Sequence, residues 1–279
     1  MDRILEEYFD FDVMFDPDNF DKIMEGFWFT VRLSIVAGIT SLLFGLFLAL
    51  LRQTPGKWGA IIRWPVIAYI DIFRGVPALL TILIVSLSLG ALSERADGPL
   101  PEFIANPEWF NLPSPFWYGV FALTLTYGAY LAEVYRAGIE AVPPGQTEAA
   151  RSLGMSHGQT MRHIIVPQAV SKVIPPLLND FIALMKDTTL VSVIGLAEVV
   201  QVARDIQNVE FNSSALMLGA ILFVLVTIPL ARLVDYLIIR QQRKTSRTGG
   251  GGDDGDDGLS TSPGALQPMP SSGGAGVGS

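Results

Sequence analysis

The sequence predicts an all-α integral membrane protein with five transmembrane helices, and three observations lead to that prediction. Half of the 279 residues are hydrophobic and only 16% are charged, whereas a soluble domain carries about 25% charged residues. The apolar residues gather in long runs instead of recurring at the period of an amphipathic helix or strand. Lysine and arginine collect in every second polar segment, as the positive-inside rule of membrane proteins requires.

Composition excludes some chemistry and leaves one question open. Without cysteine, the chain forms no disulfide, thiolate metal site or thiol nucleophile. Much of the acidic charge lies in residues 2–25 and 253–257, which indicates either ordinary solvated segments or adaptation to high salt. Residues 1–25 lack the positive charge and short apolar core of a signal peptide, so we expect an external acidic N-terminal segment there.

The first span is expected over residues 26–51 and ends before Pro55 and Gly56. Small residues recur along it at every fourth position, which lets another helix approach closely. This row consists of Ala37, Ser41, Gly45 and Ala49. A similar row lies in the third span, expected over residues 116–139 after a proline-rich loop (93–115), and consists of Thr124, Gly128 and Ala132. Near the end of the third span we expect Glu133 to pair with Arg136.

The second apolar region, residues 59–92, is too long for one perpendicular span. It forms either one long tilted helix or an entry segment followed by a span that begins near Gly75. Arg74 is a candidate functional residue, because charge inside a span is rare and usually faces the bundle interior. The alternatives for Arg74 are a side chain that snorkels to the interface and a pair with Asp71 that locks a bend.

The fourth apolar region, residues 168–200, is interrupted by Pro175 and Pro176 and then by polar side chains. Polar groups and broken helices at membrane depth line a cavity or lie inside protein. A self-contained Lys186–Asp187 pair that holds helices together is the alternative. The candidate residues in this region are Asn179, Lys186, Asp187 and Thr188.

The remaining chain completes the predicted topology. We expect a polar loop at residues 201–212, a fifth span at 213–239, and a disordered acidic Gly/Ser/Pro tail at 245–279. Residues 26–244 then form the transmembrane domain. Its basic loops place the N-terminus outside, the C-terminus in the cytoplasm, and the central polar loop, residues 140–167, on the cytoplasmic side.

The central loop is predicted to form an elbow of two short helices. Pro144 suits a first helical turn, where its missing N–H has no partner to lose. Gly154 interrupts the first helix, as a turn through positive φ requires. Ser156 and Gln159 have the spacing of a capping box that begins the second helix, and Pro167 marks entry into the next span.

These residues resemble the signature of permease subunits of ABC importers. That signature is EAA-x3-G-x9-I-x-Φ-P, in which x is any residue and Φ is an apolar one. Here it is read from Glu148-Ala149-Ala150 through Gly154 and Ile164 to Val166-Pro167, with Val166 where leucine is more frequent. Together with residues 74–77, 126–146 and 184–199, it resembles the polar amino acid branch of that family over about residues 22–240.

The resemblance implies a type I ABC importer permease fold in the plasma membrane. It implies two ATPase subunits, a second permease subunit (the same or homologous), an external solute-binding protein, and an amino acid, polar or charged, as the solute. ATP and Mg are then held by the partner ATPase, since this chain has no GxxxxGK[ST] loop and binds no cofactor itself. Lipid surrounds the subunit, and no nucleic acid is involved.

The elbow signature gives the coupling residues, and the charged and polar residues inside the spans give the substrate-path candidates. The ATPase-coupling residues are Glu148, Ala149, Ala150, Arg151, Gly154 and Pro167. The candidates for the substrate path are Arg74, Asn179, Lys186, Asp187 and Thr188. We expect no metal site, because His157 and His163 lack partners at usable spacing, and no catalytic residue. The rival interpretations are an ion-coupled carrier or channel without an ATPase, and an intramembrane enzyme, for which no catalytic pair stands out.

Overall fold

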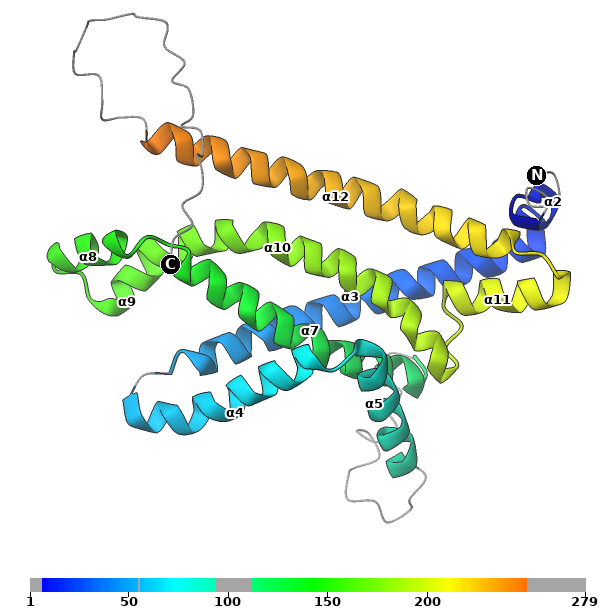
Figure 1. Cartoon of the computed structure of the whole chain (residues 1–279), viewed down its shortest axis with the longest axis horizontal. Coiled ribbons are helices and arrows are strands. Elements are labelled where there is room, and N and C mark those ends of the chain that lie inside the picture. The colour runs from blue at the N-terminus through cyan, green and yellow to red at the C-terminus, as the bar shows by residue number, and fades with distance from the viewer. Residues whose placement is uncertain (1–6, 55, 94–111, 250–279) are drawn as a thin grey trace, which may run out of the picture. The chain divides into compact units, whose positions relative to one another are not determined.

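The structure is a computed structural model that describes residues 7–54, 56–93 and 112–249, and its regular elements within these ranges are all helices (Figure 1). In chain order the helices are α2 (Phe11–Met14), α3 (Pro17–Arg52), α4 (Gly56–Gly75), α5 (Ala78–Ser93), α7 (Ser114–Glu140), α8 (Pro144–Ser152), α9 (His157–Thr160), the π-helix η2 (Met161–Ile165), α10 (Val166–Asp187), the 3₁₀-helix η3 (Thr188–Ile194), α11 (Val199–Glu210) and α12 (Ser214–Gly249).

Helix α3 begins before the predicted first span. The side chain of Asp16 accepts hydrogen bonds from the backbone N–H of Asp18 at 3.0 Å and of Asn19 at 3.2 Å. With Pro17 at the first helical position, this cap starts the helix within the segment that we expected to be external and separate. The helix ends at Arg52, so its C-terminal boundary agrees with the prediction.

The small residues of α3 and α7 form a close helix–helix interface. Ala37, Ser41, Gly45 and Ala49 are all buried, which confirms that the predicted row is a packing surface. A Cβ atom at Gly45 would lie 2.8 Å from the Cβ of Leu131 on α7 and 3.0 Å from the carbonyl oxygen of Gly128. The two backbones therefore approach each other more closely than larger side chains would allow.

The second apolar region is broken, which decides between the two predicted alternatives. Helix α4 ends at Gly75 and α5 begins at Ala78, and the two are bent by 109° at the break. Pro77 disfavours a helical conformation in the residue before it and has no N–H to donate, so a helix ends here. By length and hydropathy, α3 and residues 214–241 of α12 are long enough to span a membrane, and the bent pair makes a third span if it is counted as one.

The predicted polar loop at residues 201–212 is wrong, because α11 is an amphipathic helix. Val199, Ala203 and Ile206 lie on one face of it and are buried against α3 and the start of α12. The carboxylate of Glu198 caps the helix by accepting hydrogen bonds from the N–H groups of Val200 and Gln201. The polar residues that suggested a loop are the solvent face of this helix.

Helix α12 ends at Gly249, past residue 244 at which we placed the end of the transmembrane domain. Residues Met1–Gln241 form one compact unit, and the second unit, Gln242–Ser279, is helical as far as it is described. The predicted disordered tail otherwise falls on residues 250–279, and the predicted loop at 93–115 falls largely on 94–111. Both ranges lie outside the described residues.

Candidate functional site

The central loop folds into the predicted elbow. Helix α8 begins with Pro144, and the turn after it is made by Gly154, whose φ is +80°. The backbone N–H of Ser156 donates to the Gln159 side-chain oxygen at 2.8 Å, and the Gln159 N–H donates to Ser156 Oγ at 3.3 Å. The positive-φ glycine and the capping box are thus both confirmed as local determinants of the elbow.

The elbow presents some of its signature residues outward and buries others. Glu148, Ala149 and Arg151 are exposed, whereas Ala150 is only 4% exposed, so the two alanines do not share an outer face. Arg151 donates from Nη1 to the carbonyl oxygen of Met155 at 3.0 Å, which braces the turn around Gly154.

Leu153 is 83% exposed and was not among the predicted site residues. A leucine so exposed beside a rigid turn is typical of a contact with another molecule, although a single exposed apolar residue is also ordinary on a surface. The sequence signal for it was an apolar residue directly before the turn glycine in an otherwise polar segment.

A small apolar cluster packs at the base of the elbow, where α7 ends and α10 begins. Val142 just after α7, Ile165 at the end of η2 and Ala169 in the first turn of α10 are buried together. Lys172 on α10 donates to the carbonyl oxygen of Ala141 at 2.8 Å and ties the same two ends. Pro167 lies in the first turn of α10, where its missing N–H costs no helical hydrogen bond. These contacts join the end of α7 to the start of α10 at the base of the elbow.

A second candidate site is a polar pocket of about 350 Å³ between the α4–α5 break, α7 and α10. Its charged lining residues are Arg74, Asp180 and Asp187, and its remaining polar ones are Thr126, Tyr127 and Tyr130. The Tyr127 hydroxyl donates to Asp187 Oδ2 at 2.8 Å, and the Arg74 guanidinium carbon lies 5.8 Å from the Tyr130 ring centroid.

Two polar groups of this pocket, on Asp180 and Thr126, have no hydrogen-bond partner among the described residues. Asp180 makes no hydrogen bond or ion pair with another residue in the described ranges. Thr126 Oγ1 is buried and lacks a hydrogen-bond partner there as well. Among the described residues, Arg74 forms no ion pair with Asp71, and Lys186 forms none with Asp187, so neither locking pair that we considered is present. Thr126 is 2% exposed, and an unpaired buried polar group is costly unless a ligand or water meets it, whereas Asp180 is half-buried.

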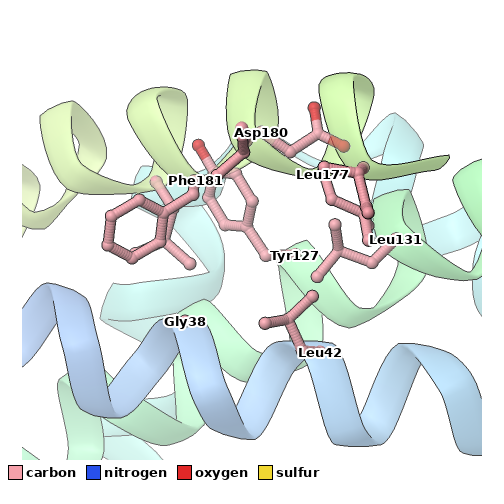
Figure 2. Close-up of a pocket in the computed structure, with 10 residues that line it drawn as sticks. Gly38, Leu42, Tyr127, Leu131, Leu177, Asp180 and Phe181 are labelled. Carbon is pink, nitrogen blue, oxygen red and sulfur yellow. The ribbon is translucent and has the colours of Figure 1, made fainter. Parts of the chain in front are cut away.

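An apolar pocket of about 330 Å³ adjoins the polar one and shares Tyr127 and Asp180 with it. Leu42 on α3, Leu131 on α7 and Leu177 on α10 point toward one another across it (Figure 2). Two adjoining pockets of different polarity suit a solute that has charged groups and an aliphatic part.

The polar pocket brings together only part of the predicted substrate path. Arg74 and Asp187 line it, whereas Asn179 and Lys186 are exposed and do not. Thr188 is buried, donates to the carbonyl oxygen of Met185 at 2.6 Å and lies 3.5 Å from Ser34 Oγ, so its surroundings are those of a core residue.

The prediction missed Asp180 and the aromatic residues Tyr127 and Tyr130. A seven-residue spacing was the available signal for Asp180, since positions 180 and 187 share one face of a helix. Positions 179 and 186 share the neighbouring face in the same way, and only the packing of α10 shows which face meets the pocket.

Comparison with known proteins identifies the family. The family model of the binding-protein-dependent transport system inner membrane component matches residues 33–243. The chain belongs to this family. This permease is therefore a multi-pass component of the plasma membrane and a transport subunit rather than an enzyme, and ATP hydrolysis in such systems belongs to a partner subunit. The predicted family is confirmed, and the comparisons lend no support to a carrier or channel without an ATPase.

Individual relatives cover most of the permease. It is 34% identical over 227 residues to the probable glutamine ABC transporter permease protein GlnM of Bacillus subtilis (strain 168), covering 81% of this chain and 96% of that one. It is 32% identical over 208 residues to the arginine transport system permease protein ArtQ of the same organism, covering 74% and 86%.

Solved structures agree with the fold of the permease. The crystal structure of an amino acid ABC transporter with histidines matches with a TM-score of 0.67 at 34% identity, over 79% of this chain and 94% of that chain. An inward-facing form of the MetNI methionine ABC transporter, at 19% identity and a TM-score of 0.58, shares the fold alone.

Proposed function

We propose that the permease moves an amino acid into the cell by alternating access, driven by ATPase subunits that dock on the elbow. The observation that carries this proposal is the polar pocket, in which Arg74, Asp180 and Asp187 face one space. An α-amino acid carries a carboxylate and an ammonium group, and the pocket offers a partner for each. The matching relatives that transport glutamine or arginine support the same solute class.

We further propose five membrane crossings with the N-terminus outside and the C-terminus in the cytoplasm. The chain would cross in α3, the α4–α5 pair, α7, α10 and α12. The elbow and the α3–α4 turn then lie on the cytoplasmic side, and α11 lies outside. The clusters of lysine and arginine in the segments assigned to the cytoplasm support this orientation.

Docking of the ATPase would use the outer face of the elbow. Glu148, Ala149 and Leu153 are among the exposed residues available for contact. Ala150, Arg151 and Gly154 would shape the elbow, and Pro167 would fix its root. The complete importer would contain two ATPase subunits with ATP and Mg, a second permease subunit, and an external solute-binding protein.

The charges of the polar pocket favour an amino acid with a cationic side chain. Arg74 suits the α-carboxylate, and one aspartate suits the α-ammonium group. If Asp187, which already accepts from Tyr127, takes the α-ammonium group, Asp180 is left without a partner unless the side chain of the solute is positive. Asp180 therefore joins Arg74 and Asp187 as a substrate-path candidate. Asn179, Lys186 and Thr188 do not line the polar pocket, so we no longer propose them.

Uptake by the reconstituted importer tests this function. The permease and its ATPase would be purified together and reconstituted in liposomes whose lumen corresponds to the cytoplasm. ATP would be placed in the lumen and the solute-binding protein outside the liposomes. We expect ATP-dependent accumulation of radiolabelled arginine, with weaker accumulation of glutamine and glutamate. Uptake that is unchanged when ATP is omitted would contradict the proposal, and ATP-dependent uptake with a preference for glutamate would contradict the assigned side-chain charge.

A further inference from the structure

A chain of four charged side chains lies between the elbow and the α3–α4 turn. Glu133 on α7 accepts from Arg52, the last residue of α3, through Oε1. Its Oε2 accepts from Arg136 Nε at 2.7 Å, and Arg136 also donates to Glu140, the last residue of α7. The predicted Glu133–Arg136 pair is thus present, but it is one part of a longer chain.

Glu133 is the most enclosed member of this ion chain. Its side chain is 15% exposed, against 61% for Glu140 at the outer end. Both carboxylate oxygens are occupied, each by an arginine from a different direction. Removing one partner of an enclosed ion pair leaves the other charge uncompensated, so such a contact holds its two helices more firmly than a surface pair does.

A hydrogen bond joins the turn that follows the ion chain to α4. The turn after Arg52 is bonded to α4, because Arg63 donates from Nη1 to the carbonyl oxygen of Thr54 at 2.5 Å. Helix α4 is continuous from Gly56 to Gly75, and its far end carries Arg74 into the polar pocket. Helix α4, which contains Pro65, thus links the α3–α4 turn to the cation of the pocket.

We infer that Glu133 is a positioning residue that transmits movement of the elbow to Arg74 in the polar pocket. The elbow moves the end of α7, Glu133 moves the end of α3 with it, and α4 changes the separation of Arg74 from Asp180 and Asp187. Because the aspartates are on α10, which follows the elbow directly through α9 and η2, the two charged walls of the pocket follow the elbow by different routes. This inference rests on the proposed function.

The test compares the variants Glu133→Gln, Arg52→Gln and the double variant in the complete importer. Three quantities are measured: co-purification of the ATPase, ATP hydrolysis, and uptake of whichever of arginine, glutamine and glutamate the unaltered complex accumulates fastest. We expect normal co-purification and a ratio of uptake to hydrolysed ATP that falls about fivefold or more in each single variant. The double variant should fall no further than the single ones, since both substitutions break the same link.

Asp235→Asn is the matched control, because Asp235 pairs with Arg232 on the exposed surface of α12 at 3.6 Å. This variant should leave the ratio unchanged. The inference would be overturned, and the proposed function left standing, by either of two results. One is a normal ratio of uptake to hydrolysed ATP in Glu133→Gln, and the other is a loss in the double variant equal to the product of the two single losses. Absence of ATP-dependent uptake by the unaltered complex would instead overturn the proposed function and the inference with it. If Glu133→Gln fails to assemble, Arg52→Gln decides, since it leaves the Glu133–Arg136 bond in place.

Discussion

The hydroxyl of Tyr127 on α7 donates to a carboxylate oxygen of Asp187 on α10 at 2.8 Å, inside the polar pocket. This bond joins the two helices that lead into and out of the elbow. It also fixes the direction of one of the two carboxylates that we assign to the solute. The pocket and the elbow are therefore connected through the same pair of helices at both ends.

Substitution Tyr127→Phe removes this bond and leaves the ring in place. A hydrogen bond to a charged group contributes about 1.5–3 kcal/mol, so we expect the KM for uptake to rise about tenfold or more. Tyr135→Phe is the control, because Tyr135 lies on the same helix but donates to the carbonyl oxygen of Leu42, outside the polar pocket. A KM that changes equally in both variants would show that the Tyr127–Asp187 bond does not orient the solute site.

The turn at Gly154 should be necessary for docking of the ATPase. Valine at a φ of +80° is strained by roughly 1–2 kcal/mol, and Gly154→Val would move the exposed residues on either side of the turn. Gly195 has the same φ and lies outside the elbow, so Gly195→Val supplies equal strain elsewhere. We expect co-purification of the ATPase to be lost only with Gly154→Val, and equal losses would count against the docking role.

The close approach of α3 and α7 should make Gly45 intolerant of even a methyl group. In Gly45→Ala the new Cβ meets the Cβ of Leu131 at 2.8 Å, and overpacking of this kind costs about 1–3 kcal/mol. The midpoint of thermal unfolding in detergent should fall. Gly219→Ala, where the nearest side-chain atom is 3.4 Å away, should unfold near the temperature of the unaltered protein. An unchanged midpoint in Gly45→Ala would contradict the tight interface.

The cap of α11 should make stability depend on pH. Burial raises the pKa of Glu198 from its usual value of 4.5 to about 7, although the N–H groups of Val200 and Gln201 and the charge of Arg204 oppose the shift. When the pKa of a carboxyl group is higher in the folded protein than in the unfolded chain, the folded protein keeps a proton that the unfolded chain has released. Raising the pH therefore lowers the free energy of unfolding.

The thermal midpoint should therefore fall between about pH 4.5 and pH 7 and level off above that. Glu198→Gln should flatten this part of the profile, and thermal scans in detergent across pH 4 to 9 would measure it. A slope of the same size in both proteins would show that Glu198 is not the titrating group.

Local signals in the sequence were sufficient to predict the elbow. Pro144, Gly154 and the Ser156–Gln159 pair each act on the backbone within a few residues, so their effect does not depend on distant packing. The row of small residues was equally readable, because its fourfold spacing is a property of one helix. Helix α11 was missed although Val199, Ala203 and Ile206 have helical spacing, since the polar face was given more weight.

The polar pocket was predictable only in part. Arg74 and Asp187 stood out as charges in apolar surroundings, and both line the pocket. Which face of α10 meets the pocket depends on how that helix packs against α7, and so does the choice between Asp180 and Asn179. Tyr127 and Tyr130 were indistinguishable in the sequence from ordinary aromatic residues of a span, and only the packing of the end of α4 beside α7 brings Arg74 near Tyr130.

Site-specific cross-linking tests the central claim most directly, because the chain has no cysteine of its own. A single cysteine at Leu153, on the elbow, or at Val209, on α11, would be labelled with a photoactivated cross-linker in the intact importer. The two side chains are similarly exposed, at 83% and 74%. The proposed function predicts that Leu153→Cys captures the ATPase subunit and Val209→Cys does not. Capture from Val209, or no capture from Leu153, would contradict it.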